Sequence, residues 1–216
     1  HIGDTVYVEK GGEIIPKIVG VDTNHRSHDA QPVMFITYCP ECGARLVRDE
    51  GEAAHRCPND THCPPQIKGR IEHFISRKAM NIMTLGPETI DEYFSRQLIH
   101  NIADLYTLTP MQITGGNTNR MVSAQKVVSS IRESVSVPFE RVLFALGIRM
   151  VGETTAKILA RNFKSIDALM AAKVEELTTI EGVGNTIAEN VVAYFQNSDN
   201  RDIIERLRAF GLQMSL

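Results

Sequence analysis

One short motif occurs twice between Ala145 and Phe195, and this repeat limits the possible folds more than any other feature of the chain. Residues 151–156 (Val-Gly-Glu-Thr-Thr-Ala) align with residues 183–188 (Val-Gly-Asn-Thr-Ile-Ala), 32 positions later. Behind each glycine, apolar residues recur at the i, i+3, i+4, i+7 spacing that marks one buried face of a helix. They are Ala156, Leu159, Ala160 and Phe163 in one copy and Ala188, Val191, Val192 and Phe195 in the other.

The repeat unit is predicted to be a helix, a glycine-containing hairpin and a second helix. An apolar run precedes each glycine, at residues 142–146 and 168–170. Two further copies are expected upstream, because a period of this length marks a recurring supersecondary unit. One copy carries Ala124, Val127, Val128 and Ile131 on the same stripe, and the other runs from Leu85-Gly86 to Tyr93 and Phe94.

The hairpins suggest phosphate binding through the main chain. Glycine tolerates positive φ and lets another backbone approach closely, and the helix that follows begins with N–H groups that lack an intrahelical partner. Such a corner is a ready anion site. The candidate glycines are Gly86, Gly152, Gly182 and Gly184. The alternative is that each glycine only ends one helix and permits the next, which we expect for the second copy, where Arg120 replaces the glycine.

Charge gives a weaker signal. The formal net charge of −3 argues mildly against nucleic acid, since most such proteins have a basic surface. Main-chain amides bind phosphate without adding charge, however, and cations can gather locally. One local group contains Lys68, Arg70, Arg77 and Lys78, with a solvated helix face as the alternative.

All four cysteines fall in one window with the spacing C-x2-C-x14-C-x5-C: Cys39, Cys42, Cys57 and Cys63. Four thiolates at such a spacing fit a tetrahedral, structural zinc site. An iron site or disulfides are the alternatives, and disulfides need an oxidising compartment for which nothing here argues. His55 and His62 are possible substitute ligands.

The amino-terminal region is predicted to be a strand pair. Residues 5–9 alternate like a half-buried strand, and Ile14-Ile15 with Ile18-Val19 form a second strand after the Gly11-Gly12 turn. Because two strands alone are marginal in water, we expect them to complete a larger sheet whose other strands precede His1. The chain lacks an initiator Met, a signal peptide and an 18-residue apolar run, so we expect part of a longer protein without a transmembrane helix.

Together these features resemble the middle and carboxyl-terminal part of a bacterial NAD-dependent DNA ligase. The resemblance covers nearly the whole chain. It rests on residues 1–4 (His-Ile-Gly-Asp), 12–16 (Gly-Glu-Ile-Ile-Pro), 73–80 (His-Phe-Ile-Ser-Arg-Lys-Ala-Met), 123–125 (Ser-Ala-Gln) and 145–149 with 151–152, and on the cysteine spacing. It implies the end of an OB-fold domain at 1–37, a four-cysteine zinc finger at 38–66 and four helix-hairpin-helix motifs at 67–216.

The resemblance also implies a role. The family clamps nicked duplex DNA through its backbone and minor groove and uses NAD and Mg to seal the nick. Thr84 and Arg120 stand where the family tends to have glycine, which puts phosphate contact by the first two hairpins in doubt. The family's K-x-D-G nucleophile does not occur in this sequence and its BRCT domain is not recognisable, so we expect this chain alone to be inactive.

The expected fold is mainly α with a small β portion. The leading hypothesis is a non-catalytic, DNA-binding part of the ligase that binds without sequence preference, with Arg149 and Lys157 as side-chain contacts. DNA replication and repair in the cytoplasm, on the nucleoid, would be its setting. Two alternatives stay open: a zinc-containing hairpin module of another DNA repair protein, and a protein-interaction domain.

Overall fold

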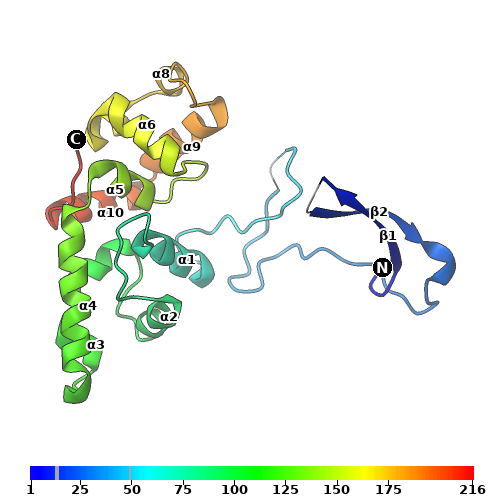
Figure 1. The fold of residues 1–216 in the computed structure, drawn as a ribbon, viewed down its shortest axis with the longest axis horizontal. Coiled ribbons are helices and arrows are strands. Elements are labelled where there is room, and N and C mark those ends of the chain that lie inside the picture. Colours follow the sequence, from blue (N-terminus) through cyan, green and yellow to red (C-terminus); the bar gives the residue numbers. More distant parts are fainter. Residues whose placement is uncertain (13–14, 49) are drawn as a thin grey trace. The chain divides into compact units, whose positions relative to one another are not determined.

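The computed structural model describes residues 1–12, 15–48 and 50–216. Contacts divide the chain into two units, His1–Pro58 and Asn59–Leu216. The first holds a two-stranded antiparallel sheet and the second is helical, as Figure 1 shows, which confirms the predicted fold class. Glu13 and Ile14, part of the predicted strand pair, lie outside the described residues.

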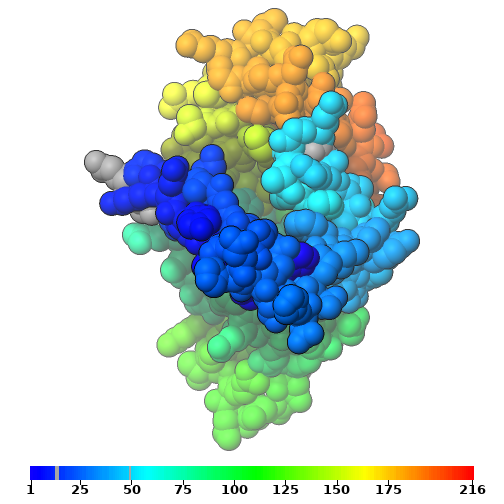
Figure 2. Space-filling view, turned by 90° about the vertical axis from the view of Figure 1, so that its right-hand side faces the viewer, coloured from blue at the N-terminus to red at the C-terminus, as the bar shows by residue number. Residues whose placement is uncertain are grey.

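The sheet pairs β1 (Thr5–Gly11) with β2 (Ile15–Asp22). Thr5 lies opposite Asp22, and the register shifts by one residue between Tyr7 and Val8. Most strand residues are exposed on both faces of the sheet, which lies in the blue part of Figure 2. A lone strand pair buries little apolar surface, and the described strand residues accordingly form no buried core. The expected larger sheet stays a prediction.

The second unit is built from short helices joined by tight turns. The 3-10 helices of this unit are η2 (Ile102–Thr107), η3 (Thr118–Arg120) and η4 (Ser134–Ser136). The α-helices are α1 (Pro64–Ile75), α2 (Pro87–Ser95), α3 (Pro110–Thr114), α4 (Met121–Glu133), α5 (Phe139–Ala145), α6 (Glu153–Phe163), α7 (Ile166–Ala171), α8 (Val174–Leu177), α9 (Asn185–Gln196) and α10 (Ser198–Ala209).

Four helix pairs follow the predicted pattern of helix, hairpin and helix: α1 with α2, α3 with α4, α5 with α6, and α8 with α9. The last pair differs in one respect from the prediction. The apolar run at 168–170 lies in α7, which ends where Ala172 adopts an extended backbone (ψ 146°). A separate one-turn helix, α8, then leads into the fourth hairpin.

The apolar stripes of the repeat form the core, as predicted. In α6 the buried residues are Ala156, Leu159 and Ala160, in α9 they are Ala188, Val191 and Phe195, and in α4 they are Ala124, Val127, Val128 and Ile131. All belong to one continuous cluster that runs through the second unit.

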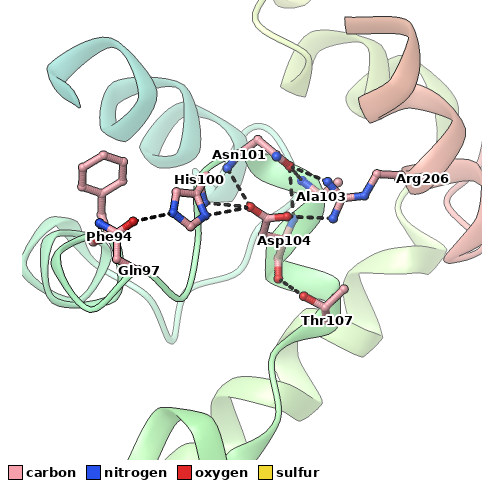
Figure 3. Close-up of polar contacts among 8 residues, drawn as sticks. All are labelled: Phe94, Gln97, His100, Asn101, Ala103, Asp104, Thr107 and Arg206. Carbon is pink, nitrogen blue, oxygen red and sulfur yellow. Dashed lines mark hydrogen bonds and ion pairs between the residues drawn. The ribbon is translucent and has the colours of Figure 1, made fainter. Parts of the chain in front are cut away.

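A polar link joins the last helix to the middle of the unit (Figure 3). Asn101 caps η2 by accepting hydrogen bonds from the amides of Ala103 and Asp104. Arg206, on α10, donates to Asp104 Oδ1 at 2.7 Å and to Asn101 Oδ1 at 3.4 Å. Because the Asp104 side chain is only 17 % exposed, this pair is shielded from water.

We expect Arg206→Met to lower the free energy of unfolding of the helical unit by about 1–2 kcal/mol, since it leaves a shielded carboxylate without its cation. Urea unfolding followed by helical circular dichroism measures the change. Arg208→Met is the matched control, because its partner Asp167 is 65 % exposed and solvent screens the pair. Equal losses for the two variants would contradict this interpretation.

Candidate functional site

The four predicted cysteines lie together. The sulfurs of Cys39, Cys42, Cys57 and Cys63 all fall within 4.8 Å of one another. The Cys42 and Cys57 sulfurs are 3.5 Å apart, which is too far for a disulfide bond of about 2.05 Å. Among the described residues, no histidine belongs to this cluster.

Local backbone geometry explains how the cysteines converge. The amide of Cys39 donates to the carbonyl of Ala44 at 2.8 Å, and the amide of Gly43 donates to the carbonyl of Cys39 at 2.9 Å. Gly43 has φ +70°, a conformation that favours glycine and closes this knuckle. Cys63 is the N-cap of α1, and Pro64 is the first residue of that helix. The start of the helix therefore positions the fourth sulfur.

The donor set fits zinc. Zn–S bonds of about 2.3 Å in a tetrahedron place neighbouring sulfurs about 3.8 Å apart, which agrees with the observed spacing. Four thiolate ligands leave no position open for a substrate, so the metal would be structural. Apart from Cys39, the described residues between Tyr38 and Pro58 contribute no buried apolar side chain, so the metal would stabilise this segment.

The first, third and fourth hairpins share one backbone design. In each, an isoleucine carbonyl accepts a hydrogen bond from the amide of the residue three positions later, and a glycine follows. The pairs are Ile82 with Leu85 at 3.3 Å, Ile148 with Val151 at 3.0 Å, and Ile180 with Val183 at 3.0 Å. The buried Leu85, Val151 and Val183 anchor these turns in the core. The sequence interpretation missed the isoleucine, although it recurs at the same offset.

The three glycines after these turns are the N-caps of α2, α6 and α9, and none has a side-chain cap. In α6 the first amide that bonds an intrahelical carbonyl is that of Ala156, which donates to Gly152. The φ values of Gly86, Gly152 and Gly184 are −130°, −79° and −81°, which any residue can adopt. A Cβ built on each would meet nothing within 4 Å. The fold itself therefore does not require glycine at these positions.

Gly182 has a different role. Its φ of +87° is the left-handed conformation, and a Cβ there would approach Ile158 at 3.4 Å. Met150 occupies the equivalent position of the third hairpin and adopts φ +64° despite its side chain. Thr84, at this position of the first hairpin, is not among the described residues with positive φ. Gly182 thus serves turn geometry, and Gly152 and Gly184 leave open the approach to the helix ends.

The second hairpin departs from this design. Arg120, the last residue of η3, takes the N-cap position of α4 with helical backbone angles. The Arg120 guanidinium reaches Glu92 on α2 at 3.3 Å and 3.4 Å. The same carboxylate accepts a bond from Arg96 at 2.9 Å. These cations, Arg120 foremost, lower the pKa of Glu92. The contacts support the expectation that this hairpin is structural.

Charged side chains gather at the start of α6. Lys157 Nζ lies 2.8 Å from Glu153 Oε1, and Lys78 Nζ lies 3.4 Å from Glu153 Oε2. The hydrogen bond from Lys157 is the main cause of the lowered pKa of Glu153. Lys157, one of the two predicted side-chain contacts, is thus paired within the chain. Arg149 lies in the third hairpin and is half-buried.

The predicted basic group at Lys68, Arg70, Arg77 and Lys78 does not form one patch of unneutralised charge. Lys68 pairs with Asp91 at 2.6 Å and Arg70 pairs with Asp60 at 2.5 Å. Lys78 belongs instead with the charges at α6. The sequence interpretation missed the pairing of Glu153 with Lys78, because these two residues are far apart in sequence.

Comparison with known proteins assigns two segments. Residues 38–64 match the family described as the NAD-dependent DNA ligase C4 zinc finger domain. Residues 141–204 match the helix-hairpin-helix motif family. These segments contain the four cysteines and the third and fourth hairpins. No described helix has the length and apolarity that spanning a bilayer requires.

Relatives match the chain from end to end. It is 58 % identical over 214 residues to a DNA ligase of Bacteroides fragilis, covering 99 % of this chain and 32 % of that protein. A DNA ligase of Phocaeicola vulgatus is 58 % identical over 216 residues, with 99 % of this chain and 32 % of the relative covered. A DNA ligase of Parabacteroides distasonis is 54 % identical over 217 residues, with 100 % and 32 % covered. The chain spans about a third of the length of these relatives.

We expect the purified chain to contain one zinc ion, and Cys57→Ser to lose most of it because three thiolates hold the metal less tightly than four. Elemental analysis after gel filtration measures the stoichiometry. His55→Ala and His62→Ala are controls that should keep one zinc, since neither imidazole belongs to the cluster. A correctly folded chain without bound metal would contradict the four-thiolate assignment.

We expect Gly182→Ala to destabilise the helical unit by about 1–2 kcal/mol, because alanine is strained in the left-handed conformation. Gly152→Ser and Gly184→Ser should leave stability within about 0.5 kcal/mol, since serine is a good N-cap and the space is open. Thermal unfolding of the three variants tests this difference. Similar losses at all three positions would show that the glycines are equally required by the fold.

Proposed function

We propose that this chain, which is similar to bacterial DNA ligases over its whole length and carries the NAD-dependent DNA ligase zinc finger, is the part of such a ligase that grips duplex DNA. The observation that supports this most is the set of glycine N-caps at Gly86, Gly152 and Gly184. At each of them the early helix amides have no side-chain cap and the space beside the glycine is open; in α2 these amides begin at Glu88, because Pro87 has no N–H.

The chemistry of these corners suits phosphate. Helix-starting amides point outward with the positive end of the helix dipole behind them, and an anion can satisfy them. A side chain at the N-cap would block the approach or bind the amides itself. Since neither φ nor internal packing requires glycine there, we infer that an external backbone, the sugar-phosphate chain, comes close at these points.

Binding of this kind is independent of base sequence. Contacts to phosphate position a protein on the duplex and do not read bases. The third and fourth hairpins, with Gly152 and Gly184, form a repeated pair that we propose holds phosphates of opposite strands. Arg149 and Lys157 would add charge at the third hairpin, and affinity should therefore fall as salt rises.

The rest of the ligase reaction belongs to the parent protein in this proposal. The K-x-D-G nucleophile does not occur in these 216 residues, so adenylation from NAD and nick sealing with Mg are assigned to other segments. The adenylation and BRCT domains would be partners within the same protein, and nicked duplex on the nucleoid, in the cytoplasm, would be the substrate. The zinc finger would fold its own segment and take no part in the chemistry.

The other two hypotheses are less well supported. A hairpin module from another repair protein does not account for the ligase zinc finger match at residues 38–64. A protein-interaction domain does not account for open, uncapped helix starts, because protein partners do not need a missing Cβ at three equivalent corners. Measuring duplex affinity after changes at the glycine corners distinguishes a protein-interaction domain from a duplex-binding domain.

We expect Gly152→Ser and Gly184→Ser each to weaken binding of a nicked duplex by about tenfold, which corresponds to about 1.4 kcal/mol. The serine hydroxyl would cap the amides that the phosphate needs and would occupy the open space. Fluorescence anisotropy with labelled nicked duplexes of two unrelated sequences measures affinity, and both sequences should give the same value.

Gly69→Ser is the matched control, because Gly69 is exposed on α1, away from any hairpin, and also has open space at its Cβ position. It should bind like the unmodified chain. Folded Gly152→Ser and Gly184→Ser variants that keep full affinity would refute phosphate binding by these corners.

A further inference from the structure

We propose that Glu153 is an intramolecular competitor of the duplex: its carboxylate holds Lys78 and Lys157 in the unbound chain and weakens the grip of the third hairpin. This inference rests on the proposed function. Glu153 is acidic, yet it lies at the start of α6, where the proposed function places a phosphate.

The carboxylate occupies both lysines at once. Glu153 Oε1 accepts a hydrogen bond from Lys157 at 2.8 Å, and Oε2 lies 3.4 Å from Lys78. Lys157 stands one turn further along α6. Lys78 comes from the turn after α1 and is far from Glu153 in sequence. Two cations from different segments therefore meet at one anion beside the open Gly152 corner.

Arg141 fixes this arrangement. Its guanidinium, on α5, donates to the carbonyl of Arg77 at 2.7 Å and to that of Lys78 at 3.2 Å. These bonds hold the backbone that carries Lys78 against the α5–α6 pair. The lysine thus stays near Glu153 through main-chain anchoring.

A phosphate and the Glu153 carboxylate would compete for the same partners. Glu153 is the first residue of α6, so its negative charge is favourable at the helix dipole when no ligand is bound. An arriving phosphate brings a second negative charge to this end of the helix. To bind the phosphate, the lysines must leave or share the carboxylate, and the two anions repel. Glu153 therefore stabilises the unbound chain at the expense of affinity.

The equivalent hairpins lack this device. In the fourth hairpin, Asn185 stands at the Glu153 position and Glu189 stands at the Lys157 position. In the first hairpin the corresponding residues are Pro87 and Asp91. The competing carboxylate is thus specific to the third hairpin. Removing it there and adding one at Asn185 should therefore change duplex affinity in opposite directions.

We expect Glu153→Gln to bind nicked duplex about two- to tenfold more tightly at low salt, the range that release of two exposed ion pairs supports. The plot of log affinity against log salt should become steeper, by up to about two charges, because both lysines are then available to phosphate. Asn185→Asp should bind more weakly. The melting temperature of Glu153→Gln should fall slightly while its affinity rises, which a purely structural role would not produce.

Two double variants, Glu153→Gln with Lys78→Met and Glu153→Gln with Lys157→Met, show whether the gain passes through the lysines. Each should lose part of the added affinity. If the unmodified chain binds duplex and Gly152→Ser weakens it, but Glu153→Gln binds equally or less tightly, the competitor role is refuted and the proposed function stands. If the unmodified chain binds no duplex, the proposed function itself fails.

Discussion

Unbonded main-chain amides at the starts of α2, α6 and α9 are the feature on which the functional account depends. An α-helix always begins with N–H groups that lack an intrahelical partner, and most proteins cap them with a side chain. This chain uses glycine at three equivalent corners, at Gly86, Gly152 and Gly184, and leaves the adjoining space open. The rest of the helical unit holds those corners in place.

The core explains how such exposed corners can be rigid. The first, third and fourth hairpins are each tied inward by a buried residue directly before the glycine and by a backbone hydrogen bond to an isoleucine carbonyl. Longer-range links hold the unit together: Arg206 on α10 donates to Asp104 on η2, and His73 Nε2 on α1 donates to the carbonyl of Phe144 on α5 at 2.8 Å. Backbone groups aimed by a packed scaffold lose little entropy on binding, which favours affinity. The apolar cluster stabilises the helices, and the cysteine cluster with its metal would stabilise its own short segment in the same way.

The helices, their buried faces and the cysteine cluster could be predicted from the sequence, because they depend on local periodicity and spacing. The stripes behind Gly152 and Gly184 specify both the helices and their buried faces, and four cysteines with no remainder specify one cluster. What could not be predicted depends on contacts between distant residues. The placement of α8 follows from where the backbone of Ala172 ends α7. The pairing of Glu153 with Lys78, and the reach of Arg120 to Glu92, need the folded chain, since no spacing rule links residues so far apart. The left-handed conformation of Met150 could not be predicted from the sequence, because glycine is the residue that usually adopts this conformation.

Amide chemical shifts of the isotope-labelled chain, recorded while nicked duplex is added, show whether the helix-starting amides bind the duplex. We expect the largest shifts at the first amides of α6 and α9, from Glu153 to Thr155 and from Asn185 to Ile187. The start of α4, behind Arg120, should change little. Duplex binding with unchanged amides at α6 and α9, and shifts concentrated elsewhere, would contradict the account.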